Sequence, residues 1–167
     1  MPERNVLFVC TGNTCRSPMA EVQARKQADA GGYAGLGVGS AGTAADNGAA
    51  ASDMAIRVAA GRGLDLSQHL SAALTPERIS RSDLVITMTR RHLEVVSRLA
   101  PEAPVILATE FLPPGHPLHG RDVPDPFGSS LETYEATWEV LEECVDGLFE
   151  ELGRGREQRP YPGSPDS

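Results

Sequence analysis

The sequence has few aromatic residues, few cysteines and fewer basic than acidic side chains. Phe, Trp and Tyr make up 5% of the 167 residues, so the core has to be built mainly from aliphatic side chains. The three cysteines, Cys10, Cys15 and Cys144, include no Cys-x-x-Cys pair, which argues against a zinc knuckle and a secreted disulfide framework. With 15 Lys and Arg against 23 Asp and Glu, the net charge of −8 disfavours a nucleic-acid partner.

A hydrophobic run long enough for a signal peptide or a membrane span is also missing from the beginning of the sequence. Val6–Val9 is the apolar stretch found there, and it is far too short for either. We therefore expect a soluble cytoplasmic protein, monomeric and without a membrane partner, whose thiols stay reduced. A length of 167 residues is typical of a single domain, and a domain of this size needs neither disulfides nor a structural metal to fold.

Short apolar runs alternate with helical patterns along the chain. Three continuous runs have strand length and a fourth is diluted by glycine: Val6–Val9, Leu84–Ile86, Pro104–Leu107 and Leu36–Ser40. Helical patterns occupy 18–30, 52–62 and 90–100. Continuous apolar runs are typical of strands that are covered on both faces, so the pattern predicts βαβ units and an α/β fold with a parallel sheet.

The last predicted helix has the clearest periodicity. Seven apolar residues recur at alternating spacings of three and four: Leu131, Tyr134, Trp138, Leu141, Val145, Leu148 and Leu152. This stripe predicts a helix that packs on the sheet, with a coiled-coil dimer as the alternative. From Gly153 onward the sequence is dense in Pro, Gly and charge, so we expect a single domain over 1–153 and a flexible tail over 154–167.

The stretch from Cys10 to Pro18 has the residues for anion chemistry. It follows a predicted buried strand, and Ser17 and Pro18 mark the start of a helix. A loop of this length can wrap around a tetrahedral oxyanion with its backbone N–H groups pointing inward. Arg16 can bind two phosphate oxygens, and the same positive field favours a Cys10 thiolate, which can attack phosphorus. Gly12 would let the backbone turn towards the anion, and the Ser17 hydroxyl could assist the thiolate.

The alternative interpretation, without a catalytic role, is that Cys10 is a buried free cysteine and Arg16 a surface residue. Phosphoryl transfer to Cys10 would also need a proton donor for the leaving group, and Asp125 is the candidate because prolines on both sides restrict its backbone. On the residues alone, Asp125 is equally well interpreted as a turn residue that caps the last helix.

The segment from Val6 to Glu21, VLFVCTGNTCRSPMAE, resembles the signature of the low-molecular-weight protein tyrosine phosphatases. Three later segments resemble further motifs of that family in the same order: Ser40–Thr43, Asp65–His69 and Asp125–Phe127. The resemblance implies a three-layer α/β/α fold with a four-stranded parallel sheet. It also implies that the substrates are phosphorylated proteins and that no metal or organic cofactor is needed.

The resemblance further implies roles for individual residues. Cys10 would be the nucleophile, Arg16 the phosphate clamp, and Asp125 first an acid and then the base for water. The phosphate would be bound by the residues that follow the nucleophile, which are Thr11, Gly12, Asn13, Thr14, Cys15, Arg16 and Ser17. The loop would be supported by hydrogen bonds of Asn13, Ser17, Ser40 and His69. A reversible Cys10–Cys15 disulfide would shield the nucleophile from over-oxidation.

Departures from the tyrosine-specific pattern bear on the substrate. Tyrosine-specific members usually carry Ile or Leu where this chain has Thr14, and they carry aromatic residues around the mouth, which 43–48 lacks. Thr14, Phe127-Gly128 and the Asn-Gly pair at 47–48 resemble the bacterial protein arginine phosphatase branch instead. A phosphoguanidino group is rich in N–H donors, which a Thr hydroxyl can accept and an Ile cannot. Phosphoarginine is therefore the predicted substrate and phosphotyrosine the alternative, with Thr14 and Phe127 as specificity residues.

Several weaker patterns do not predict a second site. Residues 37–42 match a dinucleotide-binding glycine pattern but lack the helix that should follow it. His116 and His119 could bind a metal, but they lie in a proline-rich loop that we expect to be exposed; we expect His92 to be a solvated helix residue and Cys144 to lie in the core. Two rival functions are an arsenate reductase, which normally needs two further cysteines in a later segment, and a non-catalytic phosphate-binding module.

Overall fold

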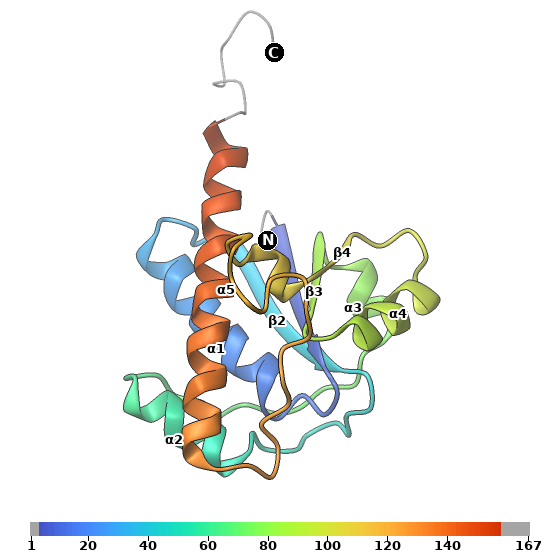
Figure 1. The fold of residues 1–167 in the computed structure, drawn as a ribbon. Coiled ribbons are helices and arrows are strands. Elements are labelled where there is room, and N and C mark those ends of the chain that lie inside the picture. Colours follow the sequence, from blue (N-terminus) through green and yellow to red (C-terminus); the bar gives the residue numbers. More distant parts are fainter. Residues whose placement is uncertain (1–3, 158–167) are drawn as a thin grey trace, which may run out of the picture.

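The computed structural model describes residues 4–157, and a parallel sheet of four strands forms its centre (Figure 1). The strands are β1 (Arg4–Cys10), β2 (Leu36–Gly42), β3 (Leu84–Thr87) and β4 (Val105–Leu107), in the order β2-β1-β3-β4. The predicted fold class, a four-stranded parallel sheet flanked by helices, is confirmed. All four predicted strands are present, and the glycine-diluted one is longer than expected because β2 pairs with β1 along its whole length.

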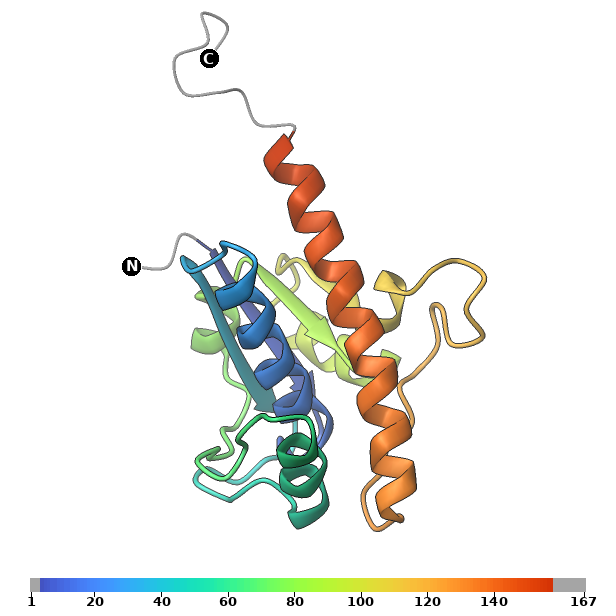
Figure 2. The same cartoon turned by 90° about the vertical axis from the view of Figure 1, so that its left-hand side faces the viewer.

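Helices cover both faces of the sheet. They are α1 (Arg16–Ala30), α2 (Asp53–Gly61), α3 (Pro76–Ser80), α4 (Arg90–Leu99), the 3₁₀ helix η1 (Ala108–Phe111) and α5 (Leu131–Glu157). Figure 2 shows α1 and α5 lying side by side on one face, where they contact each other and α2 packs against α5. The short helix α3 was not predicted from the sequence, since five residues are too few for a periodic pattern.

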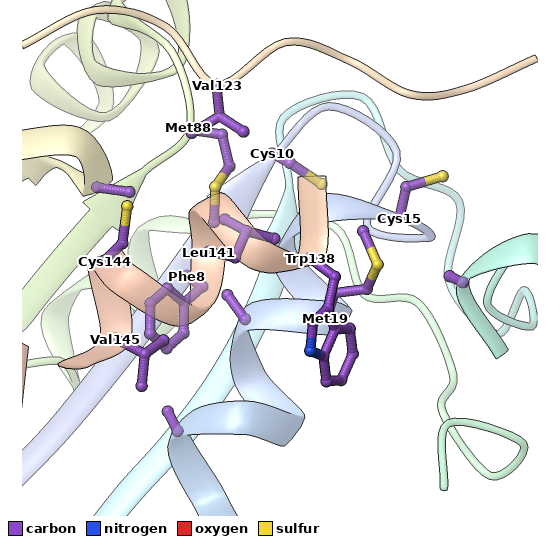
Figure 3. Packing of buried hydrophobic residues seen from close by; sticks show 14 of the residues in the cluster. Phe8, Cys10, Cys15, Met19, Met88, Val123, Trp138, Leu141, Cys144 and Val145 are labelled. Carbon is purple, nitrogen blue, oxygen red and sulfur yellow. The ribbon is translucent and has the colours of Figure 1, made fainter. Parts of the chain in front are cut away.

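The central strand β1 sends alternate side chains into two separate clusters. Val6, Phe8 and Cys10 belong to the larger cluster, which α1 and α5 complete, whereas Leu7 and Val9 pack with α3 and α4. This burial on both faces explains why the strand is a continuous apolar run. Figure 3 shows Phe8, Trp138 and other members of the larger cluster, with Cys10 and Cys15 among them.

Helix α5 places the predicted apolar stripe against the rest of the domain. Tyr134, Trp138, Leu141, Val145 and Leu148 are all buried. Cys144 lies beside them as expected, and burial raises the pKa of its thiol to about 12. The stripe therefore has its partners within the chain, and a coiled-coil dimer is not needed to cover it.

The end of α5 differs from the prediction. The helix continues to Glu157, through residues that we expected in the tail from 154 onward. Arg154 pairs with Glu151 one turn earlier, which stabilises the helix past Gly153. The rest of the expected tail, 158–167, lies outside the described residues.

Gly147 lies where α5 packs tightly against η1, and this contact gives a stability prediction. A Cβ at this position would lie 2.0 Å from the carbonyl oxygen of Phe111. We expect Gly147→Ala to lower the free energy of unfolding by about 1–3 kcal/mol, because the backbone of η1 has to move. Denaturant unfolding followed by fluorescence of Trp138, the single tryptophan, measures this.

The matched control is Gly155→Ala in the last turn of α5. Among the residues that the structure describes, none places a neighbouring atom within 4 Å of a Cβ built at Gly155, and Ala favours a helix over Gly. This variant should be as stable as the native chain or slightly more stable. Equal destabilisation by both substitutions would contradict the close approach at Gly147.

Candidate active site

The loop between β1 and α1 brings Cys10, Arg16 and Ser17 together. Cys10 is the last residue of β1 and Arg16 the first residue of α1, so the predicted strand, loop and helix are all present. The Cys10 Sγ lies 2.9 Å from the Ser17 Oγ, and both side chains are buried. This hydroxyl can therefore donate a hydrogen bond to a thiolate at Cys10.

Asn13 is at the centre of the loop and has a left-handed backbone conformation, with φ of 56°. Its side-chain amide donates to the hydroxyls of Ser17 at 2.8 Å and Ser40 at 2.9 Å, and its side-chain oxygen accepts from the N–H of Ala72 at 2.9 Å. The Nε2 of His69 donates to the backbone carbonyl of Asn13 at 2.8 Å. The four residues expected to support the loop thus meet at one point. Asn is one of the few residues other than glycine that adopt this conformation readily, and these hydrogen bonds hold Asn13 in it.

A second glycine, and not Gly12, makes the tight approach to the loop. A Cβ at Gly12 would meet the Thr14 Oγ1 at an ordinary 3.6 Å, so the protein around Gly12 is not crowded, and its expected role towards a bound anion stays a prediction. A Cβ at Gly42 would lie 2.4 Å from the carbonyl oxygen of Thr11 and 2.9 Å from the Asn13 nitrogen. Gly42 ends β2 beside Cys10, its partner in the sheet register, and so lets the two backbones pass closely.

The Arg16 side chain links the loop to the segment that contains Asp125. Its guanidinium is buried, donates to the carbonyl of Val123 at 2.9 Å and lies 3.6 Å from the Asp125 carboxylate. The Asp125 side chain is about half exposed, and its other oxygen accepts from the N–H of Phe127 at 3.1 Å. Phe127 is 72% exposed. Ser130, not Asp125, accepts from the first turn of α5, so the interpretation of Asp125 as a helix cap is wrong.

His92 is not a solvated helix residue, contrary to our expectation. It is 3% exposed, and its Nε2 lies 2.8 Å from the hydroxyl oxygen of Thr11. Burial, followed by the charge of Arg16, lowers the pKa of the imidazole to about 4. The neighbouring arginines at 90 and 91 made this helix start look fully exposed in the sequence, and nothing in the sequence indicated the contact with the loop.

Cys15 lies in a small polar cluster on the α5 side of the loop. Its Sγ is 3.2 Å from the Tyr134 hydroxyl and 3.4 Å from the Ser52 hydroxyl, and burial raises the pKa of Tyr134 to about 12. Cys10 and Cys15 are free thiols in this structure. The apolar stripe predicted the burial of Tyr134 but gave no sign that its hydroxyl meets the loop.

The weaker motifs form no further site among residues 4–157. The glycine pattern at 37–42 lies within β2, with no helix directly after it. His116 pairs with Glu143 at 3.0 Å, and His119 donates to the carbonyl of Leu112. Within the same residues, no three His, Cys, Asp or Glu side chains are grouped to hold a metal, and no helix is long and apolar enough to cross a membrane.

Comparison with known proteins identifies the family. The sequence profile described as "Low molecular weight phosphotyrosine protein phosphatase" matches residues 5–158. The chain belongs to this family. Its low molecular weight phosphatase relatives include the protein-arginine-phosphatase of Bacillus subtilis (strain 168), which is 34% identical over 91% of this chain and 99% of the relative. The tyrosine phosphatase Wzb of Escherichia coli (strain K12) is 36% identical over 83% of this chain and 88% of the relative.

Solved structures of family members agree with the fold. The YwlE arginine phosphatase from Geobacillus stearothermophilus superposes with a TM-score of 0.83 at 34% identity, covering 95% of this chain and 99% of that one. The tyrosine phosphatase Wzb from Escherichia coli K30, solved with sulphate, has a TM-score of 0.77 at 34% identity, covering 89% and 98%. Low molecular weight phosphatases of both named specificities therefore share this backbone.

The buried neutral His92 predicts that the fold is acid-sensitive. In the unfolded chain its pKa is close to 6.5, so between about pH 6.5 and pH 4 the unfolded state binds a proton that the folded state does not. The titration of His92 therefore costs the fold nothing above about pH 6.5, and it lowers the free energy of unfolding progressively as the pH falls towards 4. We expect a loss of at most about 3 kcal/mol from this residue over the window.

Denaturant unfolding at both ends of the window, on the native chain and on His92→Gln, measures this loss. The Gln variant has no imidazole to titrate, so its free energy of unfolding should fall less. An equal fall in the two proteins would show that His92 does not cause the acid sensitivity.

Proposed function

We propose that the chain is a cysteine-dependent protein phosphatase that removes the phosphoryl group from phosphoarginine side chains through a phosphocysteine intermediate. The observation that carries the proposal is the Cys10 thiol beside the Ser17 hydroxyl, on a loop whose other end holds the buried Arg16 guanidinium. A tetrahedral dianion in this loop would be bound by backbone N–H groups and by the planar guanidinium.

In the first step the Cys10 thiolate attacks phosphorus. The S–P bond forms, the P–N bond of phosphoarginine breaks, and Asp125 gives its proton to the departing guanidine nitrogen. Asp125 suits this role because its half-exposed carboxyl lies 3.6 Å from Arg16, at the site and accessible to a substrate. The Ser17 hydroxyl stabilises the thiolate before attack and again when it leaves.

In the second step water releases the phosphate. The Asp125 carboxylate takes a proton from the water, the water oxygen bonds to phosphorus, and the S–P bond breaks to return the thiolate. Asn13, Ser40 and His69 act indirectly, because their hydrogen bonds keep the loop in the conformation that directs its N–H groups to one point.

The choice of phosphoarginine over phosphotyrosine depends on Thr14 and on the surroundings of Asp125, where Phe127 is exposed. Thr14 lies in the loop, and its hydroxyl can accept an N–H of the guanidinium. Phe127 is exposed beside Asp125, whereas the segment 43–48 offers no aromatic wall for a phosphotyrosine ring. The named arginine phosphatases among the relatives support the same choice.

Phosphotyrosine is the second candidate, and one observation favours it. Relatives named as tyrosine phosphatases are about as similar to this chain as those named as arginine phosphatases, with identities of up to 36% in both groups. For either substrate we propose phosphorylated proteins in the cytoplasm as the targets and a monomer without metal or cofactor as the active form, on the family resemblance.

Removal of the proposed nucleophile tests the mechanism. Cys10→Ser should lower kcat for an aryl phosphate by at least about a thousandfold, because a serine hydroxyl is not ionised in this field. Cys144→Ala, a cysteine change in the core cluster away from the loop, is the control and should keep kcat within about twofold. Full activity of Cys10→Ser would exclude the proposed mechanism, and no hydrolysis by the native chain would favour a phosphate-binding module.

Substitutions of Thr14 test the substrate. The native chain should have a higher kcat/KM for a phosphoarginine peptide than for a phosphotyrosine peptide, and Thr14→Val, which removes the hydroxyl at almost constant shape, should lower this preference about tenfold. Thr14→Ile should favour phosphotyrosine further, and Thr14→Ser, which keeps a hydroxyl, should behave like the native chain. A native preference for phosphotyrosine would establish the second candidate instead.

A further inference from the structure

His92 is a buried polar residue that the proposed mechanism does not use. It lies in the first turn of α4, where its backbone N–H donates to the capping Thr89 hydroxyl at 3.2 Å. The same turn is held from outside, because the N–H of Arg90 donates to the Asp122 carboxylate at 2.8 Å. The backbone that carries His92 is therefore held both by its own helix cap and by the segment that precedes Asp125.

Among residues 4–157, the His92 ring makes one hydrogen bond, and its partner lies in the loop between Cys10 and Arg16. Its Nε2 lies 2.8 Å from the hydroxyl oxygen of Thr11, the residue directly after Cys10. On the other side of Thr11, the N–H of Ala44 donates to its carbonyl at 2.9 Å. Thr11 is itself exposed, so its hydroxyl would be free to rotate without the imidazole.

The protonation state of the ring follows from its surroundings. Burial and the charge of Arg16 lower its pKa to about 4, and the opposing charges of Asp122 and Asp125 do not reverse this, so the ring is neutral near pH 7. Its Nδ1 is buried and has no hydrogen-bond partner among the described residues. A buried N–H without a partner is rarer than a buried lone pair without one, so the proton belongs on Nε2, which donates to Thr11.

We propose that His92 is a positioning residue that holds Thr11, and with it the first backbone N–H after Cys10, in the orientation that binds the phosphoryl group. The hydroxyl of Thr11 is the link between them. This inference rests on the proposed phosphatase function but is independent of whether the substrate is phosphoarginine or phosphotyrosine, because both present the same dianion to the loop.

Two pairs of substitutions separate the hydrogen bond from the side chains that make it. Thr11→Ser and His92→Gln keep the bond, since the Gln Nε2 reaches as far from the main chain as the His Nε2. Thr11→Val and His92→Asn remove it. The measurement is the inhibition constant of inorganic phosphate against hydrolysis of an aryl phosphate, near neutral pH.

We expect the inhibition constant to rise about 3- to 10-fold in Thr11→Val and in His92→Asn, the range for one lost hydrogen bond, and to stay within about twofold in Thr11→Ser and His92→Gln. The double variant Thr11→Val/His92→Asn should be no worse than the worse single variant, because both remove the same bond. His116→Asn is the matched control, since His116 pairs with Glu143 outside the loop. It should leave the inhibition constant unchanged.

Nitrogen NMR of the ring provides a readout that a structural role alone would not give. Near neutral pH, the native chain should show His92 as the neutral Nε2–H tautomer, and Thr11→Val should shift the Nε2 resonance while His116 keeps its own. Thr11 is exposed, so Thr11→Val should fold and give the test even if His92→Asn does not.

The outcomes that would overturn the proposal differ from those that would overturn the function. Multiplicative effects in the double variant, no rescue by Gln and Ser, or a protonated His92 near neutral pH would each exclude the positioning role. A native chain that neither binds phosphate nor hydrolyses the aryl phosphate would instead exclude the phosphatase function.

Discussion

The structure of the site depends on the left-handed backbone of Asn13. This conformation reverses the chain inside the loop, and it is held from three directions by Ser17, Ser40 and His69. Each partner comes from a different part of the fold: α1, β2 and the segment before Ala72. These contacts hold the five-residue loop between Cys10 and Arg16 in a conformation that is costly for most residues and that Asn adopts more readily.

The parallel sheet provides those neighbours because its strands all end at one edge. Cys10 ends β1, Gly42 ends β2 beside it, and Met88 follows β3 with its carbonyl accepting from the N–H of Val123. The ends of the three strands thus surround the loop, while the two apolar clusters on either side of β1 hold these strands in place. Ligand sites of parallel α/β folds lie at this edge for the same reason.

Much of this could be predicted from the sequence, and the exceptions share a cause. Continuous apolar runs indicated the strands, periodicity indicated α5, and the spacing of Cys10 and Arg16 indicated the loop. Local patterns do not reveal which distant backbone comes close, so the close approach of Gly42 to Thr11 and Asn13 was not predicted. The charged neighbours at 90 and 91 likewise indicated that His92 is exposed to solvent, although its ring is buried and contacts Thr11.

Val123 belongs to two hydrogen bonds at once. Its N–H is bonded to the carbonyl of Met88 at 2.8 Å, and its own carbonyl accepts from Arg16 at 2.9 Å. Asp125 follows two residues later, so the segment that carries the carboxyl is anchored both to the end of β3 and to the Arg16 guanidinium. The guanidinium and the carboxyl therefore share one anchor, and a substitution that displaced Val123 from Met88 would disturb the positions of both.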